Sequence, residues 1–143
     1  MNLEEPTPLI ITRVRQQARA IRSFDLLPEG AESTHGVAFV PGQVALLGVA
    51  GDEAAYFAFA SAPEDRELEV LVKQSFGASN RIFDMQEGEH IELLEVTGHG
   101  FDLEEQKGKD LVFVAMGTGV APLRSRTSAS LRRSTGILAM LSW

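Results

Sequence analysis

The first hundred residues alternate between apolar and polar positions in short stretches, which glycine, proline and other turn residues interrupt. Alternation with a period of two predicts strands that have one buried and one exposed face. Six such strands are expected, over 8–16, 18–28, 43–49, 55–62, 68–74 and 90–96. Because short strands joined by turns favour antiparallel pairing, and closure removes unpaired edges, we expect a mainly β fold built on a six-stranded antiparallel barrel.

One helix is expected within this β-rich part, over 79–89. Ser79 and Asn80 are residue types that cap the N-terminus of a helix, and Gly88 is of the type that ends one. The helix therefore lies between the fifth and sixth strands and caps the barrel.

The pattern changes after Phe101. A charged, glycine-containing linker leads to a continuous apolar run over 111–116, which predicts a strand that is buried on both faces. A helix is expected over 123–133, and Pro122 precedes it at a place that a first helical turn tolerates. We therefore place a barrel domain at 5–103 and the start of an α/β segment at 104–143.

Gly117, Thr118 and Gly119 lie between this predicted strand and helix. Glycines at such a turn let the backbone approach a pyrophosphate, whose charge is stabilised by the helix N-terminus. The third glycine of the dinucleotide-binding fingerprint is absent, and Pro122 occupies its place. The three residues therefore predict either a nucleotide-binding loop or an ordinary strand-to-helix turn.

Composition limits the functions of the chain. Its net charge of −7 disfavours nucleic acid as a partner, since such binding depends on Lys and Arg. The absence of cysteine excludes disulfides, iron–sulfur ligation and thiol catalysis within the chain. His35, His90 and His99 lack the spacing of metal ligands, so no metal site is predicted. No apolar run is long enough to span a membrane and no secretory signal is present, so we expect a cytoplasmic protein.

Charged residues are unevenly distributed. Glu64, Asp65, Glu67 and Glu69 are predicted to form a turn and a solvated strand face. The tail over 124–143 contains four arginines and no Asp or Glu, in contrast to the acidic residues that precede it. This change of composition indicates a chain that is cut short or altered after about residue 125.

Six short motifs occur in a characteristic order: PGQ at 41–43, ASAP at 60–63, LVK at 71–73, GASN at 77–80, GHGFD at 98–102 and VAMGTGVAPLRS at 114–125. In order and spacing they resemble the ferredoxin–NADP reductase superfamily. In that family an antiparallel flavin-binding barrel precedes a nucleotide-binding α/β domain. The subgroup that the chain most resembles contains the electron-transfer subunits of dihydroorotate dehydrogenase and the gamma subunits of hydrogenases.

The resemblance implies a flavin site on the strand over 55–62. The family's Arg-x-Tyr-Ser/Thr signature falls on Ala55, Tyr56, Phe57 and Ala58, so the phosphate-binding arginine and the hydroxyls are missing, while Phe57 keeps an aromatic ring. Small side chains at 58, 60 and 62 leave room for a flat molecule. Whether Tyr56 or Phe57 faces the flavin stays open. The implied flavin residues of this strand are Tyr56, Phe57, Ala58, Phe59 and Ser61.

A second flavin element is implied at the start of the helix. Gly77 and Ala78 would bring the backbone close to a pyrophosphate, and Ser79 and Asn80 would supply polar side chains. Either of two cations, at 73 and 81, could replace the missing arginine. Lys73 is the one that we assign to the site, together with Gly117, Thr118 and Gly119 for the nicotinamide nucleotide.

The resemblance implies a flavin-dependent oxidoreductase that passes electrons between NAD(P)H and an acceptor through FAD, with no catalytic side chain required. Two alternatives stay open: a barrel that holds flavin and only relays electrons, and a cofactor-free interaction module. The segment over 110–143 holds about one βαβ unit, so the nucleotide-binding domain is expected to be incomplete. The expected partner is an electron-acceptor protein or the missing nucleotide-binding domain.

Overall fold

The computed structural model describes residues 2–34, 37–102, 104–106, 108–131 and 138–142. In chain order its elements are β1 (Asn2–Ala18), β2 (Ile21–Pro28), β3 (Val44–Gly48), β4 (Ala54–Ala58), β5 (Leu68–Lys73), α1 (Ala78–Phe83), β6 (His90–Thr97), η1 (Glu104–Gln106), β7 (Val112–Met116), η2 (Gly117–Gly119), α2 (Val120–Leu131) and β8 (Leu138–Ser142). The predicted mainly β fold is confirmed.

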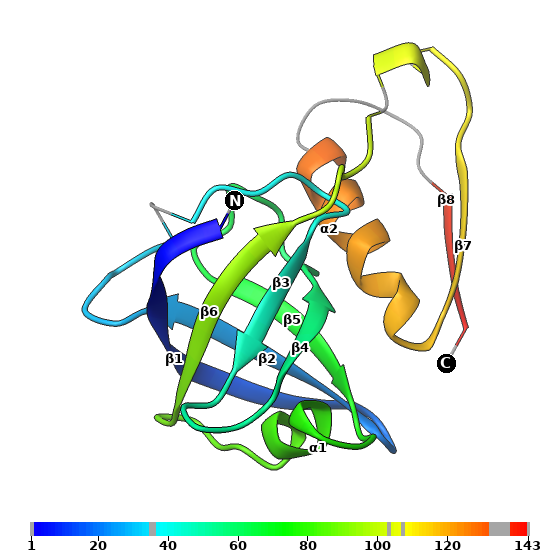
Figure 1. Ribbon diagram of the computed structural model, residues 1–143. Helices are drawn as coiled ribbons and strands as arrows, with labels where there is room; N and C mark the ends of the chain where they lie inside the picture. Colours follow the sequence, from blue (N-terminus) through cyan, green and yellow to red (C-terminus); the bar gives the residue numbers. More distant parts are fainter. Residues whose placement is uncertain (1, 35–36, 103, 107, 132–137, 143) are drawn as a thin grey trace.

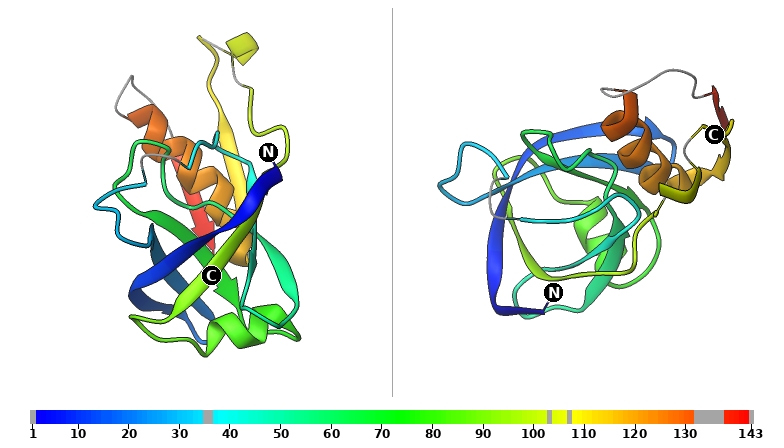
Figure 2. Two further views of the ribbon diagram at one scale, coloured as in Figure 1. Left: turned by 60° about the vertical axis from the view of Figure 1, so that its left-hand side comes forward. Right: turned by 90° about the horizontal axis from the view of Figure 1, so that it is seen from above.

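Six strands form one antiparallel sheet with the order β4-β3-β6-β1-β2-β5. The sheet curls until its two edge strands approach each other (Figures 1 and 2). The chain just beyond β4 meets β5 there, through a bridge between Phe59 and Val70 and a 2.7 Å hydrogen bond from the Ala60 amide to the Glu69 carbonyl. Register shifts in β1 between Ile11 and Arg13 mark irregularities of the kind that bend a strand.

Inward-facing side chains of all six strands fill the space inside the curled sheet. Phe24 and Phe59 are both fully buried, and the ring of Phe59 stacks on that of Phe39 with 4.1 Å between centroids. On β6 the alternation is direct, since Ile91 and Leu93 are buried while Glu92 between them is partly exposed. The period-two pattern of β6 therefore corresponds to one face turned toward the core, whereas β2 and β5 are buried along most of their length.

The helix α1 is shorter than predicted. It covers Ala78–Phe83 rather than 79–89, and Gly77, not Ser79 or Asn80, precedes it with a φ of 58° and without a side-chain capping hydrogen bond. The positive φ of Gly77 turns the chain directly out of the preceding segment, so the helix begins earlier than the capping residues indicated. It ends at Asp84 rather than near Gly88, and Met85 then packs into the core.

The segment after the barrel forms a small βαβ unit. β7 and β8 pair in parallel, and α2 lies between β7 and the barrel (Figure 1). The strand predicted over 111–116 is present as β7, and the predicted helix is present as α2, which begins at Val120 rather than at 123. Residues 132–137 and 143 lie outside the described residues. No helix of the described chain is both long and apolar enough to cross a membrane.

The prediction that 111–116 is buried on both faces is wrong. Val112, Val114 and Met116 are 75%, 84% and 83% exposed. A strand of a parallel sheet is buried when helices cover both faces, whereas among the described residues α2 is the helix that contacts β7 and it covers one face. The apolar run has the composition of a buried strand, but half of its side chains face solvent.

Replacing Phe59 by alanine is expected to lower the free energy of unfolding by about 3–5 kcal/mol, because it removes a fully buried ring and leaves a cavity. Phe76→Ala is the matched control: Phe76 is 92% exposed, so its loss should change stability by less than about 0.5 kcal/mol. Urea denaturation of both variants provides the measurement. Equal losses would contradict the core described here.

The single tyrosine of the chain gives a second test of the strand faces. Tyr56 is 57% exposed on the outer face of the sheet, and its hydroxyl donates a 3.2 Å hydrogen bond to Oε2 of Glu95. This hydrogen bond and the carboxylate charge raise the pKa of Tyr56 above its ordinary value. In an ultraviolet pH titration Glu95→Gln should lower the tyrosine midpoint, whereas Glu92→Gln should leave it in place. An unchanged midpoint in Glu95→Gln would show that the pair does not form.

Candidate functional site

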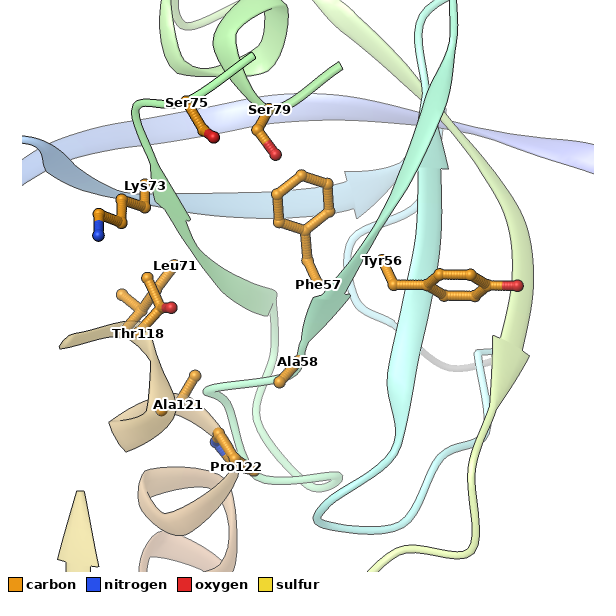
Figure 3. Close-up of a pocket in the computed structure, with 11 residues that line it drawn as sticks. Tyr56, Phe57, Ala58, Leu71, Lys73, Ser75, Ser79, Thr118, Ala121 and Pro122 are labelled. Carbon is orange, nitrogen blue, oxygen red and sulfur yellow. The ribbon is translucent and has the colours of Figure 1, made fainter. Parts of the chain in front are cut away.

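A cavity of about 410 Å³ lies where β4, β5, the start of α1 and the turn before α2 come together (Figure 3). Its size is within the range of small-molecule and cofactor sites. Its lining residues are Tyr56, Phe57, Ala58, Leu71, Lys73, Ser75, Ser79, Thr118, Gly119, Ala121 and Pro122. The barrel therefore forms one wall, and the βαβ unit forms the other.

The pleat of β4 places its two aromatic side chains on opposite faces. Figure 3 shows the ring of Phe57 on the cavity side of the strand, whereas the ring of Tyr56 points away from it, toward β6 and Glu95. Ala58 follows beside the cavity with a side chain of one carbon. Of the two aromatic side chains of β4, Phe57 is the one on the cavity side, and it is also 7% exposed and packed in the apolar core.

The polar part of the cavity comes from the segment between β5 and α1. β5 ends at Lys73, and the turn at Gly77 then directs the chain into α1. Lys73, Ser75 and Ser79 all line the cavity. Both serine hydroxyls are directed toward the space beside Phe57, whereas the side chain of Lys73 extends away from Phe57 (Figure 3). One cation and two hydroxyls can donate hydrogen bonds to an anionic group there.

The opposite wall belongs to the turn predicted as a nucleotide-binding loop. Thr118 and Gly119 lie in η2, and Ala121 and Pro122 form the first turn of α2. A Cβ atom built on Gly119 would meet no other atom within 4 Å, so open space lies beside this backbone. Gly117 has a φ of 59°, a conformation that side-chain-bearing residues rarely adopt.

The other predicted site residues lie outside this lining: Phe59, Ser61, Gly77, Ala78, Asn80 and Gly117. Phe59 belongs to the core, and the Ser61 hydroxyl accepts a 3.0 Å hydrogen bond from the Glu69 amide. Gly77 approaches Glu53, whose carboxylate would be 2.9 Å from an added Cβ. These contacts give three of the residues structural roles in the described chain.

Four lining residues were not predicted: Leu71, Ser75, Ala121 and Pro122. Leu71 lies in the motif LVK, and Ala121 and Pro122 lie in the motif VAMGTGVAPLRS. Their apolar side chains gave no reason to assign them to a site, but their positions within these motifs could have done so. Nothing in the sequence indicated that Ser75 belongs to the site, because a serine between a strand and a glycine is typical of any turn.

The prediction that Glu69 belongs to a solvated strand face is wrong. Its side chain is 9% exposed, and Oε1 accepts hydrogen bonds from Arg15 Nη2 at 3.0 Å and from Arg124 Nη1 at 2.8 Å. Glu69 pairs with Asp25 across β5 and β2, and opposed carboxylates need a cation between them. Arg15 supplies it, with two 2.7 Å hydrogen bonds to Asp25.

Burial raises the pKa of the Asp25 carboxyl, and the hydrogen bonds and charge of Arg15 offset only part of that effect. The four side chains, Arg15, Asp25, Glu69 and Arg124, form a charged cluster that connects the barrel with α2 beside the cavity. Within the described residues no three His, Asp or Glu side chains gather as metal ligands would. His35 lies outside those residues.

No protein-family model matches the chain. It is 27% identical over 115 residues to the gamma subunit of sulfhydrogenase 2 from Pyrococcus furiosus, covering 80% of this chain and 40% of that protein. It is 29% identical over 119 residues to a probable dihydroorotate dehydrogenase B (NAD(+)) electron transfer subunit from Methanopyrus kandleri, covering 83% and 42%. The chain thus spans about two fifths of the length of these curated relatives.

The structure superimposes on the flavohem-like FAD/NAD binding domain of nitric oxide dioxygenase from Vibrio cholerae, with a TM-score of 0.81 and 17% identity. The match covers 95% of this chain and 62% of the other. At this identity the likeness shows the fold, while the sequence matches give the relatives. The chain has the fold of the ferredoxin–NADP reductase-like domains, as its motifs predicted, and its relatives in sequence include electron-transfer subunits.

Proposed function

We propose that this chain is the FAD-binding part of an oxidoreductase that passes electrons between NAD(P)H and an acceptor protein. The observation that carries the proposal is the cavity between Phe57 on the barrel and the Thr118–Gly119 turn. In this proposal residues 5–103 hold the flavin, and residues 104–143 are the start of the nucleotide-binding domain. The relatives that are electron-transfer subunits support this assignment.

The side chains around the cavity fit the two ends of a flavin nucleotide. Phe57 is a core residue that is 7% exposed, and it lines the cavity with the small accessible part of its ring. Ala58 and Ala121 leave space beside it for a flat ring. Lys73, Ser75 and Ser79 offer a positive charge and hydroxyl donors for phosphate. Ala55 cannot replace the arginine of the family signature, and Arg81 is not part of the lining. Lys73 is therefore the cation that we assign to the phosphate.

A bound flavin supplies the redox chemistry, accepting a hydride from a reduced nicotinamide and releasing electrons to an acceptor. The residues of the chain position the flavin ring and the nicotinamide nucleotide. Phe57 sets the plane of the ring, and the Thr118–Gly119 turn lies on the opposite side of the cavity, where a nicotinamide nucleotide can reach the same ring. Hydride transfer depends on distance and orientation, so no acid or base is assigned.

A second candidate is a flavin-holding barrel that relays electrons without binding nicotinamide. The exposure of Val112, Val114 and Met116 on β7 favours it, because in the described residues the apolar face of this strand that lies away from α2 is open to solvent. Both candidates need the flavin, and they differ in the source of electrons.

Reconstitution with FAD separates these candidates. The chain mixed with FAD and desalted should keep a protein-bound flavin spectrum, and NADH or NADPH should bleach it without air. Bleaching by dithionite but not by either nicotinamide would favour the relay. A colourless chain after desalting would contradict both flavin candidates and leave an interaction module.

The two aromatic residues of β4 give a matched pair of variants. Phe57→Leu should weaken FAD binding about tenfold, because it removes the ring that stacks on the flavin and retains an apolar side chain. Tyr56→Phe should leave the affinity unchanged, since that ring points away from the cavity. Flavin fluorescence titration measures both. Equal effects would contradict the assigned ring contact.

The cation assignment has its own test. Lys73→Met should weaken binding of FAD about two- to fivefold, as expected for one exposed ion pair, and should leave riboflavin, which has no phosphate, unaffected. Arg81→Met is the control with the same change of charge. If Arg81→Met weakened FAD binding more than Lys73→Met, Arg81 rather than Lys73 would be the cation that binds the phosphate.

A further inference from the structure

The apolar contact between α2 and the barrel is small. Val120 and Ala121 are the buried apolar side chains of this helix in its described part, and they pack against Ile21, Ala60 and Leu71. Side chains of this size bury little area and do not by themselves fix the rotation of a helix about its axis. A second, directional contact is needed to orient α2.

Arg124 supplies that contact. It lies three and four residues after Ala121 and Val120, which places it on the same face of the helix. Its Nη1 atom donates a 2.8 Å hydrogen bond to Oε1 of Glu69, and the same oxygen accepts from Arg15 Nη2 at 3.0 Å. The carboxylate of Glu69 therefore connects a cation of the barrel with a cation of the helix.

Glu69 is held in place from several directions. Its amide bonds to the Ser61 hydroxyl, and Arg15 is fixed in turn by both oxygens of Asp25 and by the Ser23 hydroxyl. A buried carboxylate with this support has little freedom to reorient, so it specifies the direction from which Arg124 approaches.

The turn formed by Thr118 and Gly119, which precedes Arg124 in the chain, forms one wall of the cavity. Thr118 and Gly119 precede Arg124 by about a turn and a half of chain, so any rotation of α2 moves them relative to Phe57. We propose that Glu69 and Arg124 are positioning residues, which orient α2 on the barrel and thereby keep the Thr118–Gly119 turn opposite Phe57. The consequence for flavin rests on the proposed function, whereas the orientation of the helix does not.

The test uses the absence of cysteine from the chain. Spin labels on Arg81→Cys and Met116→Cys, at exposed positions of α1 and β7, report the distance between barrel and βαβ unit. The doubly spin-labelled protein without further substitutions, called the parent, should give one narrow distance distribution in the absence of any ligand. Glu69→Gln and Arg124→Met should each broaden it, and the double variant should add little, because both changes remove the same contact.

Two further variants serve as controls. Arg13→Met makes the same change of charge at an exposed position of β1 and should leave the distribution narrow. Arg124→Lys keeps the charge and should restore most of the narrow distribution. An unchanged distribution in Arg124→Met, even with a lowered melting temperature, would overturn the positioning role. A broad distribution in the parent would overturn it as well.

Flavin titration of the same variants connects the two proposals and keeps them separable. Arg124→Met should weaken FAD binding several-fold relative to Arg13→Met. Broadened distances with no FAD binding by the parent would contradict the proposed function and leave the positioning role intact. Narrow distances in Arg124→Met would contradict the positioning role whatever the FAD affinity.

Discussion

The six-stranded sheet closes where its two edges meet, and this closure positions the residues of the candidate site. The bridge between Phe59 and Val70 joins the chain after β4 to β5, and it brings Phe57 and Lys73 to the same opening. β4 and β5 are at opposite ends of the sheet order, so in a flat sheet they would lie far apart. The cavity therefore follows from sheet closure, and its chemistry follows from which side chains the pleat turns toward it.

The barrel could be predicted from sequence because its signals are local. Alternation identifies strands, and the motifs from PGQ to GTGVAP identify their order. The two wrong predictions of burial concern residues whose exposure depends on tertiary contacts. Glu69 has the composition of a solvated residue, but the register of β5 places it opposite Asp25 and beside two arginines. The apolar run of β7 has the composition of a buried strand, but its exposure depends on which elements cover it.

The site was predicted in part for a similar reason. Motif position brought Phe57, Ala58, Lys73, Ser79, Thr118 and Gly119 together, and the structure places all of them around one cavity. It could not say which aromatic side chain of β4 faces inward, because a shift of one residue exchanges the two faces of a strand. It also could not foresee the charged cluster, whose members Arg15, Asp25, Glu69 and Arg124 are far apart in sequence.

In the proposed complex a flavin ring lies against Phe57, with its phosphates beside Lys73, Ser75 and Ser79. A crystal structure of the chain grown with FAD tests this arrangement most directly. We expect electron density for the isoalloxazine ring between Phe57 and the Thr118–Gly119 turn, with the pyrophosphate at the start of α1. Density for the ring on the Tyr56 face, or FAD bound elsewhere on the chain, would contradict it.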